Sequence, residues 1–250
     1  MTADGYPARW YAVGPSITMA EQNLGEESDF RVRAARRKRE RMRHRLLVAT
    51  MTVCSAQDRR EPATIDDVIR VAEVARGTFY KYFTTLDEAI DDVGRLLADE
   101  TVESLQAMVA DVDDPAMRIA MGAQILTTRA AKEPIWGGFI CNTNHLTRES
   151  ALVAAMRVNA LHGQQAGQFQ FRSLEAAIDA QMGIVMQGVR RMLNGERRQD
   201  YVLDIASMSL KALGLTPKTA DKLAESAASW LRERAPQFPA WPPLGGKIVD

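Results

Sequence analysis

Apolar residues recur at three- and four-residue spacing from about residue 36 to residue 230, and this helical period constrains the fold more than any other feature. Alternation of β-branched and polar residues, the pattern of strands, is nearly absent over the same span. Helix starts are marked as well, because Thr64 and Thr85 precede acidic first turns and Asp114 precedes a proline. The sequence therefore predicts an all-α fold.

Composition and spacing exclude several classes of protein. No run approaches the roughly 18 apolar residues of a membrane-spanning helix, and the start of the chain lacks the pattern of a secretion signal. The two cysteines, Cys54 and Cys141, lack metal-ligand spacing, and His145 and His162 lie too far apart for a zinc pair. We therefore expect a cytoplasmic protein that is not an enzyme and binds no cofactor, no metal and no membrane.

Charge is segregated along the chain although the formal net charge is zero. Residues 31–45, which we call the basic run, hold nine Lys and Arg and one Glu, whereas residues 87–114 hold ten Asp and Glu and one Arg. A basic run of this density attracts polyanions such as nucleic acids. Taken alone, it is equally typical of a solvated basic surface.

The stretch from Thr64 to Phe83 carries the most informative pattern. It predicts a short amphipathic helix, a turn, and a second short helix whose Phe79 and Phe83 point inward. Two short helices that meet at a steep angle are typical of the helix-turn-helix, in which the second helix enters the major groove. A plain corner of a helical core is the alternative, and the adjoining basic run favours DNA binding. The outward residues of the second helix, which we call the reading face, are Arg76, Gly77, Thr78, Tyr80 and Lys81.

With these residues in view, the segment 43–95 resembles the N-terminal domain of the tetracycline-repressor (TetR) family of transcriptional regulators. The resemblance is most specific from Arg76 to Phe83, where Gly-Thr-aromatic-Tyr is followed by a closing Phe. It implies a homodimer that binds a palindromic operator in double-stranded DNA. It also implies a C-terminal helical domain that binds a small-molecule inducer and forms the dimer interface.

The resemblance further implies the residues that contact DNA: one on the first helix, a cap and phosphate contact at the start of the second, and base and phosphate contacts from the third. These are Arg45, Thr64, Arg76, Gly77, Thr78, Tyr80 and Lys81. Three positions depart from the family pattern. Glu73 replaces the turn glycine, Ala75 the capping serine of the third helix, and Leu86 a phosphate-binding lysine.

These observations divide the chain into four segments. They are a flexible N-terminal tail ending in a basic arm (1–35), a DNA-binding domain (36–95) with its helix-turn-helix at about 64–83, a helical ligand-binding and dimerisation domain (96–235), and a Pro-rich C-terminal tail (236–250).

The stretch 133–145 differs in composition from its helical surroundings, because aromatic residues stand beside two glycines and several polar groups. An apolar pocket with a few orienting polar groups needs such a mixture, although a kinked core helix explains it equally well. The pocket residues that we predict, for a largely apolar inducer, are Met121, Ile125, Trp136, Phe139, Ile140 and Asn142.

Two apolar stripes, at 174–193 and 200–213, are joined by a short loop and are expected to form neighbouring antiparallel helices. Paired with the same helices of a second subunit, they would form a symmetric four-helix interface. Alternatively, both stripes cover only the core of their own domain. The predicted interface residues are Leu174, Ile178, Met182, Val185, Val189, Ile205 and Met208.

The sequence thus predicts a sequence-specific, ligand-responsive transcriptional regulator, most simply a repressor. The alternative is a helical protein whose basic arm binds RNA or anionic surfaces without sequence preference. Salt dependence is common to both, whereas a strong preference for one duplex sequence belongs only to the regulator.

Overall fold

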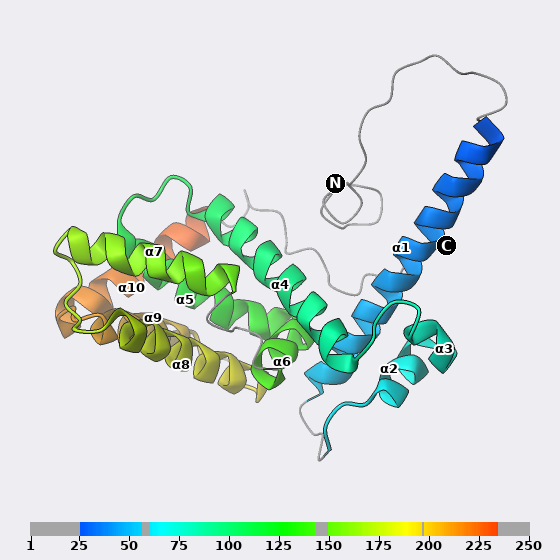
Figure 1. The fold of residues 1–250 in the computed structure, drawn as a ribbon. Coiled ribbons are helices and arrows are strands. Elements are labelled where there is room, and N and C mark those ends of the chain that lie inside the picture. Colours follow the sequence, from blue (N-terminus) through cyan, green and yellow to red (C-terminus); the bar gives the residue numbers. More distant parts are fainter. Residues whose placement is uncertain (1–25, 57–60, 144–149, 197, 235–250) are drawn as a thin grey trace.

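The computed structural model describes residues 26–56, 61–143, 150–196 and 198–234. Every regular element in these ranges is an α-helix, which confirms the all-α prediction. None of these helices combines the length and the apolar character that crossing a membrane requires. The helices are α1 (Glu26–Ser55), α2 (Ile65–Ala72), α3 (Arg76–Phe79), α4 (Leu86–Met108), α5 (Pro115–Lys132), α6 (Pro134–Asn142), α7 (Ala151–Gln165), α8 (Leu174–Leu193), α9 (Gln199–Ala212) and α10 (Pro217–Arg234) (Figure 1).

α1 is longer than the sequence pattern suggested. It begins at Glu26, within the segment 1–35 that we expected to be a flexible tail, and its N-terminal half projects away from the other helices (Figure 1). The reason is local, since Ala, Arg, Lys and Glu are strong helix formers and Arg36 pairs with Glu40 one turn later at 2.8 Å. Residues 1–25 and the Pro-rich segment 236–250 lie outside the described residues.

The first three helices and the first turns of α4 form one unit, which we call the head. α2 packs on α1 and on α3, and α4 packs on α1. Phe79 and Phe83 are 0% and 2% exposed, which confirms their predicted inward orientation. The buried apolar residues of the head include Leu46, Leu47, Val68, Ala72, Phe79, Phe83, Ala89 and Val93.

The remaining helices, α5 to α10, form the body, and α5 is its central element. Twelve of the 18 residues of α5 are buried, because α6, α7, α8, α9 and α10 all pack against it. α8 and α9 lie side by side, as the two stripes predict. Gly195 and Gly214 end these two helices with φ angles of 96° and 95°, a conformation that favours glycine.

Head and body meet where α6 packs against the C-terminal end of α1. The side-chain amide of Asn142 donates to the carbonyl oxygens of Cys54 and Ala56, at 3.1 and 3.2 Å. Carbonyls at a helix C-terminus have no partner within the helix, so Asn142 satisfies groups that α1 leaves open. α4 makes the second connection, since it packs on α1 at the head and on α7 in the body.

Candidate nucleic-acid interface and ligand cavity

The start of α2 is fixed by a reciprocal pair of hydrogen bonds. The Thr64 hydroxyl accepts from the backbone N–H of Asp67 at 3.2 Å, and the Asp67 carboxylate accepts from the backbone N–H of Thr64 at 3.1 Å. This is the capping box, which satisfies two otherwise open donors. Thr64 therefore caps the second helix as expected.

The turn between α2 and α3 carries two of the departures from the TetR pattern. Glu73 ends α2 in the left-handed region, with φ 51° and ψ 48°, which favours glycine over residues with a Cβ atom. Ala75 occupies the N-cap of α3 and provides no side-chain hydrogen bond. Both residues thus fill positions whose geometry suits a different amino acid, and the turn is closed by the backbone hydrogen bond from the Val74 N–H to the Ile69 carbonyl oxygen at 3.0 Å.

α3 is shorter than the helix that the sequence predicted, since it ends at Phe79, and Tyr80 and Lys81 lie in the turn that follows. The reading face, formed by α3 and this turn, is open to solvent. Gly77 and Lys81 are exposed, Thr78 is half-buried, and Tyr80 is 48% exposed although it is a large aromatic residue. A Cβ atom at Gly77 would meet nothing within 4 Å, so internal packing does not require glycine there. Glycine at this position instead allows another molecule to approach the backbone closely.

Carboxylates accompany the cations of the head. Arg76 pairs with Asp66 at 2.6 Å, and its guanidinium lies 3.5 Å from the Tyr80 hydroxyl. The hydrogen bond to Tyr80 and the charge of Asp66 raise the pKa of Arg76 above its ordinary value. Arg45 on α1 similarly pairs with Glu73 at 3.0 Å. These pairs are exposed and weak, so a phosphate or a base edge can replace the carboxylate.

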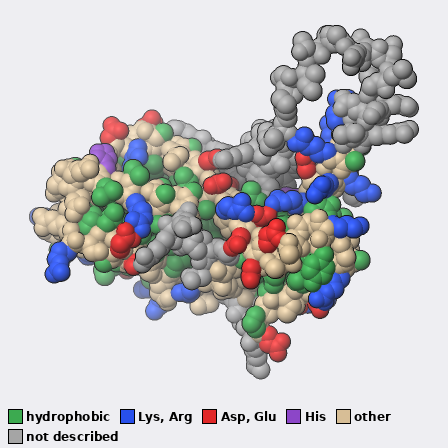
Figure 2. Space-filling view, viewed as in Figure 1, with side chains coloured by type: hydrophobic (Ala, Val, Ile, Leu, Met, Phe, Trp, Pro, Cys, Tyr) green, Lys and Arg blue, Asp and Glu red, His purple; other side chains and the backbone are tan. Residues whose placement is uncertain are grey.

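The basic run lies along the projecting part of α1. Its described side chains from Arg33 to Arg39 are exposed, and Figure 2 shows Lys and Arg side chains along this helix. The run is thus a continuous helical surface connected directly to the head. An array of this kind attracts phosphate groups without selecting a sequence.

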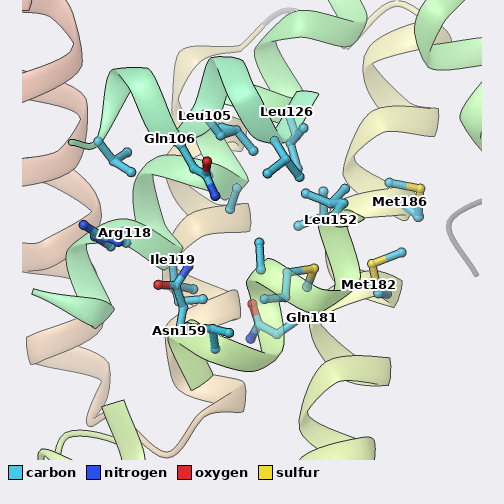
Figure 3. Close-up of a pocket in the computed structure, with 18 residues that line it drawn as sticks. Leu105, Gln106, Arg118, Ile119, Leu126, Leu152, Asn159, Gln181, Met182 and Met186 are labelled. Carbon is cyan, nitrogen blue, oxygen red and sulfur yellow. The ribbon is translucent and has the colours of Figure 1, made fainter. Parts of the chain in front are cut away.

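A cavity of about 210 Å³ lies in the body between α4, α5, α7 and α8 (Figure 3). Its walls are mainly apolar, and its polar side chains are Gln106, Arg118, Asn159 and Gln181. The predominance of apolar walls with a few polar groups is typical of sites for small organic molecules. The apolar residues in the wall include Leu105, Ile119, Leu126, Leu152, Met182 and Met186.

No protein-family model and no curated protein matches the sequence, whereas several solved structures share the fold of this chain. A solved structure of RolR with its ligand resorcinol is similar, with a TM-score of 0.59, 24% identity, and coverage of 75% of this chain and 95% of that chain. A TetR-family transcription regulator from Shewanella sp. PV-4 has a TM-score of 0.57 and 15% identity, over 69% of this chain and 96% of that one. A γ-butyrolactone receptor, an ArpA-like protein, has a TM-score of 0.51 and 15% identity, over 78% and 98% of the two chains. The chain has the TetR-family fold.

Within this TetR-type fold, none of the six residues that we predicted for the pocket lines the 210 Å³ cavity. Met121 and Ile125 are buried in the core of α5, and Asn142 caps α1. Trp136, Phe139 and Ile140 border a separate hollow of about 10 Å³, which holds one water molecule at most. Within α6, Gly138 lies against Ser55, so that part of the unusual composition of 133–145 serves the contact of α6 with α1.

The sequence pattern only weakly indicates the residues that line the cavity. Asn159 and Gln181 are carboxamides on helices whose neighbouring positions are apolar, and a polar residue in such a stripe indicates a specific partner. Leu152, Met156 and Asn159 on α7 recur at helical spacing, which is also the pattern of ordinary core residues. Periodicity alone could therefore not separate cavity walls from core.

The predicted interface stripe of the TetR-type body is largely internal to one protomer. Ile178, Val185, Val189 and Ile205 are 3%, 5%, 0% and 9% exposed in the single chain. Leu174 and Met182 are half-buried, and Met182 and Val185 also line the cavity. Met208 is 52% exposed. The core helices of one chain thus already cover most of the stripe, and only its outer edge is available to a partner.

Sequence reasoning missed a buried ionic cluster centred on Arg129, whose side chain is 0% exposed. Its guanidinium donates to Glu100 on α4 at 2.9 Å and to Glu133 at 2.9 Å, and it lies 4.4 Å from the centre of the Trp136 ring. Burial raises the pKa of Glu100 above its ordinary value, while the Arg129 cation lowers it. The cluster ties α4 to α5 and α6. Elsewhere in the described ranges, no group of three His, Cys, Asp or Glu is placed to hold a metal ion.

Proposed function

We propose that this chain is a TetR-type transcriptional regulator that binds a palindromic DNA operator as a homodimer and responds to a small molecule. The observation that carries the proposal is the head, where α3 exposes cationic, small and hydroxyl-bearing residues on the side opposite buried Phe79 and Phe83. The TetR-family fold supports it. A regulator works where chromosomal DNA is, so the proposal keeps the cytoplasmic location expected from the sequence.

In this proposal α3 enters the major groove, and the side chains of the reading face make either base contacts or phosphate contacts. Arg76 and Thr78 address base edges, since a guanidinium suits guanine and a hydroxyl suits several bases. Tyr80 and Lys81 contact phosphates, together with Thr64 at the start of α2 and Arg45 on α1. Gly77 allows the helix to approach closely, because its side is open.

Ligand response follows from the position of α4. This helix packs on α1 in the head, and its residues Val102, Leu105 and Gln106 line the cavity in the body. A ligand that binds one position of α4 better than another biases the placement of the head. Two heads must lie about one duplex turn apart, ~34 Å, to bind both half-sites, so such a shift releases DNA. The regulator then acts as a repressor that its ligand inactivates. RolR, which shares the fold, was solved with resorcinol, and this supports a small-molecule ligand.

The dimer in this proposal uses the outer edge of α8 and α9. Met208 is exposed on α9, and Gly183 on α8 would meet nothing within 4 Å if it carried a Cβ atom. These positions offer a smooth surface that a second copy related by two-fold symmetry can cover.

Selection from random DNA duplexes with the full-length protein tests the proposal. A regulator should enrich one palindromic sequence and bind it about 10³-fold or more tightly than random duplex. The matched control is a variant with Thr78→Ala and Lys81→Ala, in which the fold is intact and enrichment should disappear. Equal affinity for all duplexes would contradict the proposal.

A second function is favoured by one observation, the exposed basic surface along α1. In this alternative the projecting helix binds RNA or anionic surfaces by charge alone, and α3 has no role. The same selection separates the two, because the alternative yields no enriched sequence and is insensitive to the double variant.

A further inference from the structure

The body cavity has a charge pattern that limits what it can bind. Among the described residues that line it, none is Asp or Glu, and the one charged side chain is Arg118. The Arg118 guanidinium donates through Nε to the Val112 carbonyl oxygen. A cation moved into this cavity would lose its hydration without gaining a negative partner, which costs several kcal/mol. The site thus selects against cationic molecules.

Gln181 supplies a hydrogen-bond acceptor deep in the wall. Its side chain is 2% exposed, and its Nε2 donates to the backbone carbonyl of Ser209 on α9 at 2.5 Å. Because only the nitrogen of a carboxamide can donate to a carbonyl, this bond fixes the orientation of the amide. Figure 3 shows Gln181 pointing into the cavity. Its Oε1 has no hydrogen bond to any described residue, so a bound molecule with a hydroxyl or N–H group would supply the missing donor.

The size and the remaining walls indicate the shape of that molecule. A dry cavity of about 150 Å³ is known to hold benzene, so about 210 Å³ accommodates one ring or two fused rings. Three methionines, Met156, Met182 and Met186, line the site, and thioether sulfur makes favourable contacts with aromatic rings. Flat aromatic molecules therefore fit this site better than cationic ones.

We propose that this cavity binds a small neutral aromatic compound whose hydroxyl group donates to Oε1 of Gln181. The biological role of this binding rests on the proposed regulator function, but the binding itself requires no DNA. The class named here excludes ammonium compounds, which find no carboxylate in the described wall, and unsubstituted hydrocarbons, which leave the Gln181 acceptor without a donor.

Equilibrium dialysis with the full-length protein tests the proposal with three matched probes: 2-naphthol, naphthalene and 2-naphthylmethylamine. Wild type should bind 2-naphthol about tenfold more tightly than naphthalene, the effect of roughly one hydrogen bond in a dry site. It should bind the ammonium compound more weakly than naphthalene. Equal binding of 2-naphthol and naphthalene, tighter binding of the ammonium compound, or no binding of any probe would overturn the proposal.

Two variants place the probe in the cavity. Gln181→Met removes the acceptor at similar volume, so 2-naphthol should lose its tenfold advantage over naphthalene. Gly122→Leu fills the cavity instead, since a Cβ atom at Gly122 meets nothing within 4 Å. This variant should abolish binding of both compounds. It tests the location independently of Gln181→Met, should that variant not fold. Thr128→Leu, on the exposed side of the same helix, is the control and should bind as wild type does. Unchanged binding in Gly122→Leu would overturn the location.

The same probes separate this proposal from the proposed function. Saturating 2-naphthol should weaken binding to the selected DNA duplex in wild type and leave Gly122→Leu unaffected. If 2-naphthol binds as described but no duplex sequence is ever selected, the regulator function fails and the cavity chemistry stands. If a duplex is selected but none of the probes binds, the cavity chemistry fails and DNA binding stands.

Discussion

Gly138 on α6 lies directly against the backbone of Ser55 at the end of α1, so that a Cβ atom at position 138 would overlap the Ser55 carbonyl oxygen. This is a contact between backbone and backbone, and neither side can move away as a flexible side chain would. The junction of head and body is therefore set by the absence of a side chain.

Gly138→Ala is accordingly expected to lower the free energy of unfolding by about 1–3 kcal/mol, the usual cost of overpacking. Urea unfolding followed by circular dichroism measures it. Gly122→Ala is the matched control, because it also places a methyl group in a helix but meets open space, and it should be neutral or stabilising by up to ~1 kcal/mol. Equal stabilities of the two variants would show that the backbones at Gly138 and Ser55 can move apart to accommodate a methyl group.

The ionic cluster at Arg129 leads to a prediction about pH. Arg129→Met removes the cation from a buried carboxylate, so we expect a loss of about 3–5 kcal/mol at neutral pH. Burial already raises the pKa of Glu100, and without Arg129 that pKa rises further. The folded variant then holds a proton that the unfolded chain has lost, and its stability falls as pH rises through the folded pKa, from about 4.3 upward.

Melting temperatures of Arg129→Met between pH 5 and pH 8 should therefore decline more steeply than those of wild type. Adding Glu100→Gln removes the titrating group and should flatten the decline. A parallel pH profile for Arg129→Met and wild type would show that Glu100 is not the group responsible.

The helices and the head were accessible to sequence reasoning because their determinants are local. Thr64, with the acidic residues that follow it, forms its capping box from neighbours in the chain, and Phe79, the last residue of α3, lies only four residues before Phe83. The same local chemistry carried the resemblance to the TetR family, and the fold confirms it.

The cavity between α4, α5, α7 and α8 could not be predicted from the sequence, because it depends on which helices meet. Trp136 and Phe139 have the composition of a pocket, but α6 packs on α1, α5 and α8, and both side chains are buried. Gln181 acquires its role only through Ser209, 28 residues away, which turns its amide oxygen toward the cavity. Likewise, the apolar stripe of α8 could cover a partner or its own core, and the choice depends on α5 behind it.

Glu73 leads to a prediction in which stability and DNA binding separate. Glu73→Gly should stabilise the head by about 1 kcal/mol, because glycine adopts a φ of 51° without strain. Glu73→Gln keeps the backbone cost and removes only the charge. Both variants break the ion pair with Arg45 and remove a carboxylate from the turn before α3, so both should bind duplex DNA more tightly than wild type.

Unfolding curves and fluorescence anisotropy of labelled duplex check the two effects independently. Stabilisation in Glu73→Gln as large as in Glu73→Gly would show that charge, and not backbone conformation, is the cost at this turn.

The projecting part of α1 should govern affinity and not sequence choice. Changing Arg36, Arg37, Lys38 and Arg39 to Ala should flatten the slope of log affinity against log salt, which scales with the number of phosphate contacts. The selected duplex sequence should stay the same. Alanine preserves the helix, so circular dichroism should be unchanged. A shift in the selected sequence would mean that this helix reads a groove, as minor-groove arms do.

Thr78 and Tyr80 lie two residues apart on the reading face, and substitutions at the two positions should affect DNA binding differently. Thr78→Ala removes a hydroxyl placed to meet a base edge, so specific affinity should fall by about 1–3 kcal/mol and sequence choice should relax at one base pair per half-site. Tyr80→Phe removes the proposed phosphate contact and the hydrogen bond to Arg76, but its ring keeps the edge-on packing against Phe79, with ring centres 5.7 Å apart. Its affinity should therefore fall evenly for all sequences. Binding curves for the selected duplex and for single-base variants of it measure both effects. If Tyr80→Phe changed the preferred base and Thr78→Ala did not, the assignment of base and phosphate contacts on α3 would have to be exchanged.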